Sequence, residues 1–463
     1  MAEEYIVKDM CGSCQFTIDR EGTMTISPNK EFNNKTGTLN FKAVSGPEDW
    51  PWSRYRDDIK KVIVDKGVTL GAVGDYLFAG FRNCRDFQLE NLDVSMTENF
   101  EYMFMGCDSL TDISSTAAWD FQKAWRLNGM LCNCPSLEDI APAANWDVSN
   151  AMNFNEMFAG DTSLKDLTPT SGWNMRRAIF MDRMLAGCTG LESLCGTENW
   201  NAENAGSING ICEGCTSLKD ISAAGSWKMS GVLEADRSFM GCRSLKDISP
   251  VRNWKDARLQ NIRSIFEGCT SLEDISPVAE LYTGDIVDMS YAFKGCDSLK
   301  NVLPVMQWGI KDMDEGWEPG IYFDCTGIFA DCPNVPDFTA RIDADGRSVV
   351  LISKFGEEQA ELTAKNIMDK IFGEGTTGTD FIAKTPEGAS FTKEDARNVI
   401  KYAAAEMGSR KTLGKDGTIK NIRRHSEYTA AKQKAVSEIR RNPYYSKEVG
   451  KTGKEADRSA AVK

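Results

Sequence analysis

The sequence contains a single histidine, His425, among its 463 residues. Histidine takes part in most general acid–base catalysis, in the Ser-His-Asp triad and in many zinc sites. A single histidine therefore gives little support to any of these chemistries. Hydrolysis by paired carboxylates needs no histidine, but no pair of acids stands out from the repeating background described below. We therefore expect a protein that is not an enzyme and that binds no metal and no cofactor.

Long apolar runs are also missing. No stretch approaches the roughly 18 apolar residues of a membrane span. The N-terminal residues MAEEYIVKDMCGSCQFTID have neither the basic start nor the apolar core of a signal peptide. As written, the sequence predicts a cytoplasmic or virion-associated protein, or a cell-surface protein if an export signal has been removed. Its 15 cysteines are an odd number in such a chain, which favours reduced thiols over a disulfide framework.

The formal charge of −14 is unevenly distributed along the chain. From Ile400 to the end, 16 Lys/Arg stand against 7 Asp/Glu, a balance of +9, which leaves −23 on everything before. An acidic body therefore precedes a basic tail.

What the sequence does have is a repeated phrase. EGCTSLKDISA begins at Glu213, MGCRSLKDISP at Met240 and EGCTSLEDISP at Glu267, so the step is 27 residues. The cysteine of the phrase recurs at Cys107, Cys134, Cys188, Cys215, Cys242, Cys269 and Cys296, with Asp161 in its place once. A leucine follows three residues later in every copy, an Ile, Leu or Val six residues later, and a Trp twelve residues later in all copies but one.

This period is typical of a solenoid of stacked coils. One coil has about four large apolar side chains, which contribute roughly 1.5–3 kcal/mol each, while ordering each residue costs on the order of 1 kcal/mol. A single coil is therefore unstable alone, and stacking supplies the remainder. The sequence predicts a repeat solenoid with a leucine-rich-repeat-like parallel β stack.

The repeat resembles the BspA-like leucine-rich repeat family. The resemblance rests on the pattern W-D-V-S-N…M-F-x-G-C-x-S-L-x-D-I-S, read from Trp146 onward, and on an N-terminal segment with TMTIS, PW and VIVDKGV. It covers about residues 5–340. It implies a non-catalytic surface for adhesion or recognition, often displayed outside cells, although family members usually carry an export signal.

We predict four regions. An N-terminal β cap spans 1–75, the solenoid 76–340 with a bulge at 312–320, a helical module 341–408, and a basic, partly flexible tail 409–463. In the helical module, EEQAELTAKNIMDKIFG predicts an amphipathic helix ending at Gly373, and FTKEDARNVIKYAAAEMG a second one with Thr392 as its N-cap.

Three other patterns favour structural over chemical roles. The cysteine column could be a metal or redox ladder, but Asp161 replaces one member without breaking the pattern, which favours buried structural thiols. Cys11 and Cys14 form a lone CxxC without the second pair that a zinc site needs. The G-x-G-x-x-G at Gly373 follows a predicted helix, whereas a dinucleotide site would follow a strand.

One polar column has two interpretations. Five residues after the cysteine place come Asp112, Asp139, Asp166, Asp220, Asp247 and Asp274, with Ser193 among them. Carboxylates stacked at the strand spacing repel by about 1 kcal/mol per neighbour in water, so something must offset the repulsion. Either each Asp accepts backbone N–H groups of its own turn, or the column binds a cation or a basic partner.

From these observations we expect a recognition or adhesion protein that binds a protein or a surface glycan through the solenoid. The alternative is an intracellular or virion-associated scaffold whose basic region binds nucleic acid or docks into an assembly; sparse aromatic residues in the tail favour docking to protein. Besides the Asp column, the candidate contact residues are Asp314, Glu315, Trp317 and Glu318 in the bulge and Arg410, Lys411, Arg423, Arg424, Arg440 and Arg441 in the tail.

Overall fold

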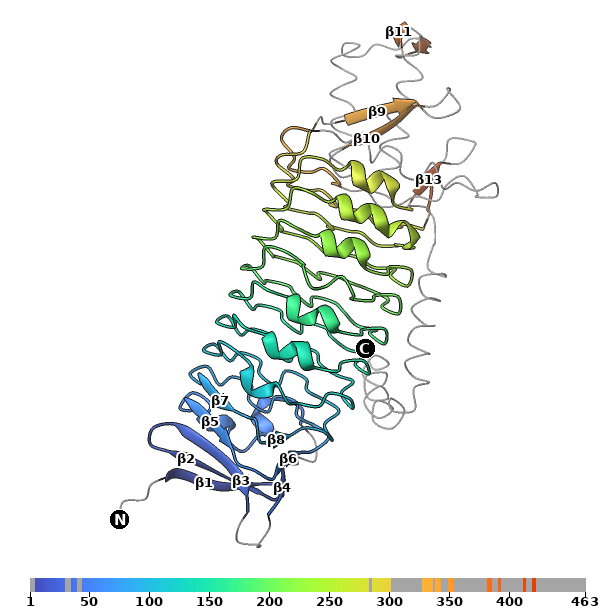
Figure 1. Cartoon of the computed structure of the whole chain (residues 1–463). Helices are drawn as coiled ribbons and strands as arrows, with labels where there is room; N and C mark the ends of the chain where they lie inside the picture. The colour runs from blue at the N-terminus through green and yellow to red at the C-terminus, as the bar shows by residue number, and fades with distance from the viewer. Residues whose placement is uncertain are drawn as a thin grey trace.

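The computed structural model describes residues 5–29, 35–39, 44–282, 285–300 and 327–335, together with the backbone of six strands between 338 and 421. Figure 1 shows an N-terminal sheet from which a long stack of similar coils rises. The prediction of a repeat solenoid with parallel pairing between coils is confirmed.

Two sheets form the N-terminal part of the chain. The first has the order β1-β2-β3-β5-β7 and the second the order β4-β6-β8. The bounds are β1 Tyr5–Cys11, β2 Cys14–Asp19, β3 Thr23–Pro28, β4 Gly37–Leu39, β5 Lys61–Val64, β6 Val68–Leu70, β7 Asp86–Gln88 and β8 Leu92–Asp93. Pairing is antiparallel from β1 to β3 and parallel from β3 through β5 to β7, so the direction of pairing changes to that of the coils within this sheet.

Successive coils pair through one segment each, which we call the bridging segment. The bridging segments are 98–106, 125–133, 152–160, 179–187, 206–214, 233–241, 260–268 and 287–295, preceded by 72–80. Isolated parallel bridges join their second residues, from Asn99 to Arg126, Asn153 and onward to Asp288. The step between these residues is the 27 residues of the sequence repeat, since 126 − 99 = 153 − 126 = 27.

Backbone hydrogen bonds link the bridging segments at alternate positions. Between the first two segments, the N–H groups of Phe100, Tyr102, Phe104 and Gly106 donate to carbonyls of the next coil at 2.9–3.0 Å. The same four donors recur in later coils, for example at Phe239, whose N–H donates to the Ile265 carbonyl at 2.9 Å. Side chains at equal positions therefore stack on one another at the strand spacing of about 4.8 Å.

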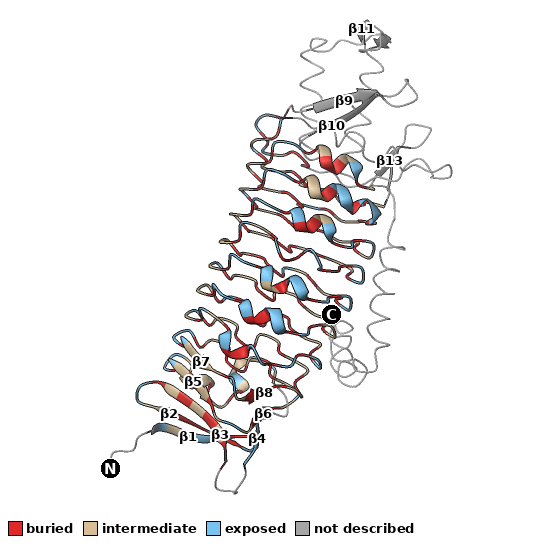
Figure 2. Cartoon of the chain, viewed as in Figure 1, coloured by how far each residue is buried: buried red, intermediate tan, exposed pale blue. Residues whose placement is uncertain are grey.

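Short 3₁₀ helices form the opposite side of the coils. Their bounds are η4 Ser114–Thr116, η5 Ala141–Asn145, η6 Thr168–Gly172, η7 Ser222–Ser226, η8 Ser249–Asp256 and η9 Ser276–Glu280, with η2 Pro47–Asp49 and η3 Ser53–Tyr55 in the N-terminal part. Figure 2 shows that these helices turn one side to solvent and bury the other. The Trp column lies at the ends of these helices, or within η8 for Trp254, and is buried; Trp200, Trp227 and Trp254 stack at 6.2–6.4 Å between ring centroids.

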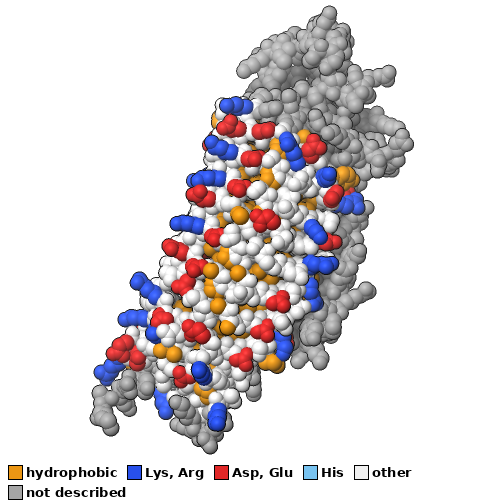
Figure 3. Space-filling view, in the orientation of Figure 1, with side chains coloured by type: hydrophobic (Ala, Val, Ile, Leu, Met, Phe, Trp, Pro, Cys, Tyr) orange, Lys and Arg blue, Asp and Glu red, His pale blue; other side chains and the backbone are white. Residues whose placement is uncertain are grey.

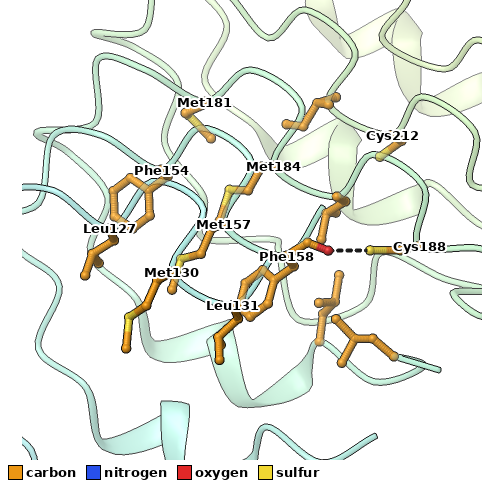
Figure 4. Packing of buried hydrophobic residues seen from close by; sticks show 14 of the residues in the cluster. Leu127, Met130, Leu131, Phe154, Met157, Phe158, Met181, Met184, Cys188 and Cys212 are labelled. Atoms are coloured by element: carbon orange, nitrogen blue, oxygen red, sulfur yellow. Dashed lines mark hydrogen bonds between the residues drawn. The ribbon is translucent and has the colours of Figure 1, made fainter. Parts of the chain in front are cut away.

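The core lies inside the coils and is continuous along the array. Phe239, Phe266 and Phe293 stack ring on ring at 5.6–5.8 Å. Figure 4 shows equivalent residues of neighbouring coils packed together, such as Leu131 against Phe158 and Met157 near Met184. Each coil therefore shares its apolar surface with both neighbours, as the unstable single coil requires.

The column cysteines are buried and free. Each thiol contacts a backbone carbonyl of the previous coil, 29 residues earlier for Cys107 and 30 residues earlier for the others, as Cys188 does with the Phe158 carbonyl at 3.0 Å. Burial raises the pKa of Cys269 to about 12. The prediction of buried structural thiols is confirmed for this column, and Cys195, outside it, is the exposed thiol among the described residues.

Two tryptophans close the N-terminal end of the stack. The carbonyls of Asp75 and Leu77, in segment 72–80, occupy positions that accept a backbone N–H from the preceding coil elsewhere in the array, and here no coil precedes. The indole N–H of Trp50 donates to the Asp75 carbonyl at 2.8 Å, and that of Trp52 to the Leu77 carbonyl at 2.9 Å. The PW segment of the predicted cap therefore satisfies carbonyls that would otherwise be buried without a donor.

Beyond the array the structure describes three antiparallel hairpins. Their strands are β9 Phe338–Ile342, β10 Val349–Ser353, β11 Phe381–Lys384, β12 Ser390–Thr392, β13 Lys411–Leu413 and β14 Ile419–Asn421. The predicted helix that ends at Gly373 and all residues of the second predicted helix after Thr392 lie outside the described residues. Thr392 itself is the last residue of β12.

We predict that Trp52→Phe lowers the free energy of unfolding by about 1–3 kcal/mol more than Trp146→Phe. Both changes remove similar volume from a buried site, but the Trp146 indole N–H makes a longer bond, 3.4 Å, to the Thr116 carbonyl. Denaturant unfolding of the full chain measures both. Equal losses would contradict the closing role of Trp52.

Candidate partner-binding surface

The predicted Asp column lies just before the 3₁₀ helices, and each of its carboxylates caps the turn that follows. Asp139 accepts the Ala141 N–H at 2.7 Å, and Asp247 accepts the Ser249 N–H at the same distance. Ser193, the one exception, accepts the Cys195 N–H with its hydroxyl at 3.0 Å. Hydrogen bonds, the largest of them from Ser114, hold the pKa of Asp112 below its usual range.

The capping interpretation of this column therefore has geometric support at every described member. Figure 3 shows acidic side chains along the array beside Lys and Arg. Lys219, next to Asp220, pairs with Glu192 at 2.9 Å, an exposed contact that contributes little to stability. The carboxylates remain exposed on their outer side, so contact with a basic partner stays a prediction.

The other predicted contact residues fall largely outside the described residues. The bulge residues Asp314, Glu315, Trp317 and Glu318 lie outside them, as do Arg410, Arg423, Arg424, Arg440 and Arg441 of the tail. Lys411 is the first residue of β13, described as backbone only. Their roles stay predictions.

The bridging segments form a second surface, which we call the ladder face. It consists of the side chains at the first, second, fourth and fifth residues of each segment, most of them half-buried or exposed and some, such as Asn128 and Ser290, buried. The fourth column reads Asp75, Glu101, Asn128, Asn155, Asp182, Asn209, Asp236, Arg263 and Ser290. The fifth column reads Tyr76, Tyr102, Gly129, Glu156, Arg183, Gly210, Arg237, Ser264 and Tyr291.

Side chains of the fourth column form a relay between coils. Asn155 accepts the backbone N–H of Asp182, Asp182 that of Asn209, and Asn209 that of Asp236, each at 2.8 Å. One coil's side chain thus holds the next coil's backbone. Burial is the main cause that raises the pKa of Asp182, and the Ser207 hydroxyl and the Asn209 N–H oppose it.

The relay is interrupted where the second column supplies a competing acceptor. Asn153 accepts the N–H of Asn155 at 3.0 Å, and Asn261 accepts that of Arg263 at 2.9 Å. Asn128 Oδ1 and Asp236 Oδ1, which would otherwise accept these N–H groups, are buried without a partner among the described residues. The N–H groups of Asn155 and Arg263 each have two candidate acceptors, and the oxygen that does not accept the bond has no partner among the described residues.

The fifth column adopts a left-handed backbone, with φ between 53° and 60° from Tyr76 to Gly327. A turn with positive φ at its third residue favours Gly, yet Tyr, Glu and Arg occupy this position in most coils. Each such residue costs roughly 1 kcal/mol or more of backbone strain. Gly129 is required for a further reason, because its added Cβ would lie 2.2 Å from the Tyr102 ring. Large side chains are thus held at strained positions on the ladder face.

The N-terminal end of the ladder face carries a stacked aromatic pair. The rings of Tyr76 and Tyr102 lie 5.3 Å apart, and the Tyr102 hydroxyl lies 3.3 Å from Glu156. Burial raises the pKa of Tyr102 to about 12 and, with Glu101 as the second cause, that of Asp75 to about 7. None of these residues is among the contact residues predicted from the sequence, although the recurrence of glycine at 129 and 210 was a signal.

Asp161 occupies the cysteine place of its coil and is fully buried. Its Oδ1 accepts the Cys134 N–H at 2.8 Å, while Oδ2 has no partner among the described residues. Burial, and then Cys134, raises the pKa of Asp161 well above its usual range. Burial therefore favours the neutral form of this carboxyl.

Two features of the described residues bear on metal binding and on membranes. In that part of the chain no group of three His, Cys, Asp or Glu side chains is placed to hold a metal ion. The helices described there are all too short or too polar to cross a membrane.

We predict that Asn209→Ala lowers the free energy of unfolding by about 1–3 kcal/mol, because the Asp236 N–H loses its acceptor. The matched change Asn153→Ala should cost less than about 1 kcal/mol, since the unpaired Asn128 Oδ1 can accept the Asn155 N–H instead. Denaturant midpoints at constant slope test the difference. A larger loss for Asn153→Ala would refute the competition.

We predict that stability falls as pH rises from about 4 through the raised pKa of Asp161, because the folded state retains a proton that the unfolded state releases. Asp161→Asn keeps the Oδ1 acceptor for the Cys134 N–H and removes this dependence. Unfolding of both proteins is measured across pH 4 to 8. Parallel curves for the two would show that Asp161 ionises freely in the fold.

Comparisons with known proteins concern the same repeats. A family model described as "Mycoplasma protein of unknown function, DUF285" matches residues 98–224 and 189–308. No curated protein matches the chain.

Eight solved chains match. A leucine-rich repeat protein from Eubacterium ventriosum is 15% identical over 63% of this chain and 88% of its own, with a TM-score of 0.27. A leucine-rich cell surface protein from Faecalibacterium prausnitzii is 15% identical over 65% and 95%, with 0.25. An internalin from Listeria monocytogenes is 15% identical over 58% and 88%, with 0.21. The solenoid assignment rests on the bridges and hydrogen bonds of this chain.

Proposed function

We propose that the chain is a non-catalytic recognition protein that binds another macromolecule through the ladder face of its solenoid. The observation that carries the proposal is the fifth column, where Tyr, Glu and Arg are held in a backbone conformation that favours glycine. Strain of this kind persists where a side chain is needed at its place.

The rigidity of the ladder face supports the same function. Backbone bonds at four positions per coil and the fourth-column relay fix each outward side chain relative to its neighbours. A preorganised surface loses little conformational entropy on binding, which favours affinity. Trp, Tyr and Arg, the residue types that dominate binding energy in interfaces, occur together there at Tyr102, Trp125 and Arg126.

The charge of the tail favours a second candidate. The balance of +9 after Ile400 against −23 before it suggests that the tail attaches the protein to an acidic protein surface, including the Asp column of its own or a neighbouring copy. Binding of nucleic acid is the alternative for the same residues. Micromolar binding of the full chain to mixed DNA and RNA that disappears by about half-molar salt, and that Arg423→Glu/Arg424→Glu weakens, would favour nucleic acid.

Photo-crosslinking tests the main proposal. A photoreactive amino acid replaces Arg237, exposed in the fifth column, or Lys255, exposed in η8 on the other side of the coil. We expect the full chain to crosslink to a macromolecule in extracts of its native source from the Arg237 position and not from the Lys255 position, as read by mass spectrometry. Products from Lys255 alone, or from neither, would contradict the role of the ladder face.

A further inference from the structure

The first column of the ladder face contains an apolar strip. Trp125, Met152 and Ile179 follow one another in three successive coils, and their backbones are joined, since Met152 N–H donates to the Trp125 carbonyl at 3.0 Å and Ile179 N–H to the Met152 carbonyl at 2.9 Å. Phe180 lies beside Ile179, and all four side chains are half-buried. We call these four residues the apolar strip; Met96 lies two positions before the first column of the preceding coil, in the same column as Lys123 and Arg177.

An exposed methionine borders the strip at its N-terminal end, and a cation packs on its first residue. Met96 is 54% exposed, and its sulfur lies 2.9 Å from the Lys123 ammonium of the next coil. The Arg126 guanidinium lies over the Trp125 ring at 4.2 Å and pairs with Glu101 at 3.3 Å. Trp, Met, Phe and Arg are the residue types enriched in the cores of protein–protein interfaces.

Three cations border one side of this strip. Lys123, Arg176 and Arg177 are exposed and lie two or three positions before the first column in their coils. None of them forms an ion pair with a carboxylate among the described residues; Arg177 instead donates to the Asn150 amide at 2.8 Å. Asp120 and Asn174, the acceptors nearest in sequence, cap the N–H groups of Gln122 and Arg176.

We propose that the apolar strip and its cationic border bind an acidic protein segment with apolar anchor residues, an inference that rests on the proposed function. The strip buries the anchors, and Lys123, Arg176 and Arg177 pair with carboxylates on the flank of the same segment. A positive border on a body with net negative charge selects for such a partner by charge complementarity. Aliphatic Met96, Met152 and Ile179 favour protein anchors over the sugar rings of a glycan.

The probe is a displayed library of random 12-residue peptides selected on the full chain, with binding of selected peptides measured by fluorescence anisotropy. We expect enrichment of Asp and Glu together with large apolar residues. Trp125→Ser and Phe180→Ser should each weaken binding at least tenfold. Arg177→Glu should weaken it severalfold at low salt and less at high salt, while the matched Lys255→Glu in η8 should leave it unchanged.

A thiol at the strip gives an independent readout. Ile179→Cys in the full chain should react with maleimide faster than the buried column cysteines, and a selected peptide should protect it. An unreactive thiol would show that the chain's own residues cover the strip, which would overturn the proposal.

Peptides rich in Lys or Arg, peptides indifferent to the strip variants, or no peptides at all would also overturn the proposal, as would glycan-array binding that the strip variants abolish. The Arg237 crosslinking experiment distinguishes a failure of this inference from a failure of the proposed function. Crosslinks from Arg237 together with any of these outcomes would leave ladder-face recognition standing and remove only the acidic partner.

Discussion

The ladder of backbone hydrogen bonds between successive coils governs this structure. It requires that each coil repeat the path of the last, so every side chain lies on its own counterpart about 4.8 Å away. Apolar columns gain from this arrangement, because Phe lies on Phe and Trp on Trp. Polar columns do not gain, because identical charged or hydrogen-bonding groups lie against one another. Each polar column therefore needs other hydrogen-bond partners.

The hydrogen-bond partners of the polar groups differ from column to column. The Asp column directs each carboxylate to the N–H groups of its own turn. The cysteine column places a weak donor against a carbonyl of the previous coil, so that neighbouring thiols need not satisfy one another. In the fourth column the stacking itself provides the partner, because a side-chain oxygen accepts a backbone N–H of the next coil. Asp161 is the exception, an acid at a buried thiol position whose neutral form is favoured by burial.

The sequence was sufficient for features that depend on one coil at a time. The period, the buried Trp and Leu columns and the capping role of Asp139 or Asp247 follow from local pattern and turn chemistry. Features that join coils could not be predicted in the same way. The acceptor of the Asn155 N–H depends on a competition between Asn153 and Asn128, and the bonds of Trp50 and Trp52 join segments 25 residues apart. The left-handed backbone at Tyr102 could not be predicted, because glycine occupies the equivalent position only in some coils.

The hydrogen bonds between bridging segments also have a direction. At four positions per coil the N–H points toward the C-terminal coils and the carbonyl toward the N-terminal ones. At the start of each segment the bond runs the other way, as from the Trp125 N–H to the Glu98 carbonyl. Because the four positions outnumber it, the stack is polar, with an acceptor-rich end and a donor-rich end, and the net peptide dipole of the segments has the sense opposite to that of an α-helix. Indole groups occupy the acceptor-rich end at Asp75 and Leu77, so the array is sealed against extension by a further strand from that side.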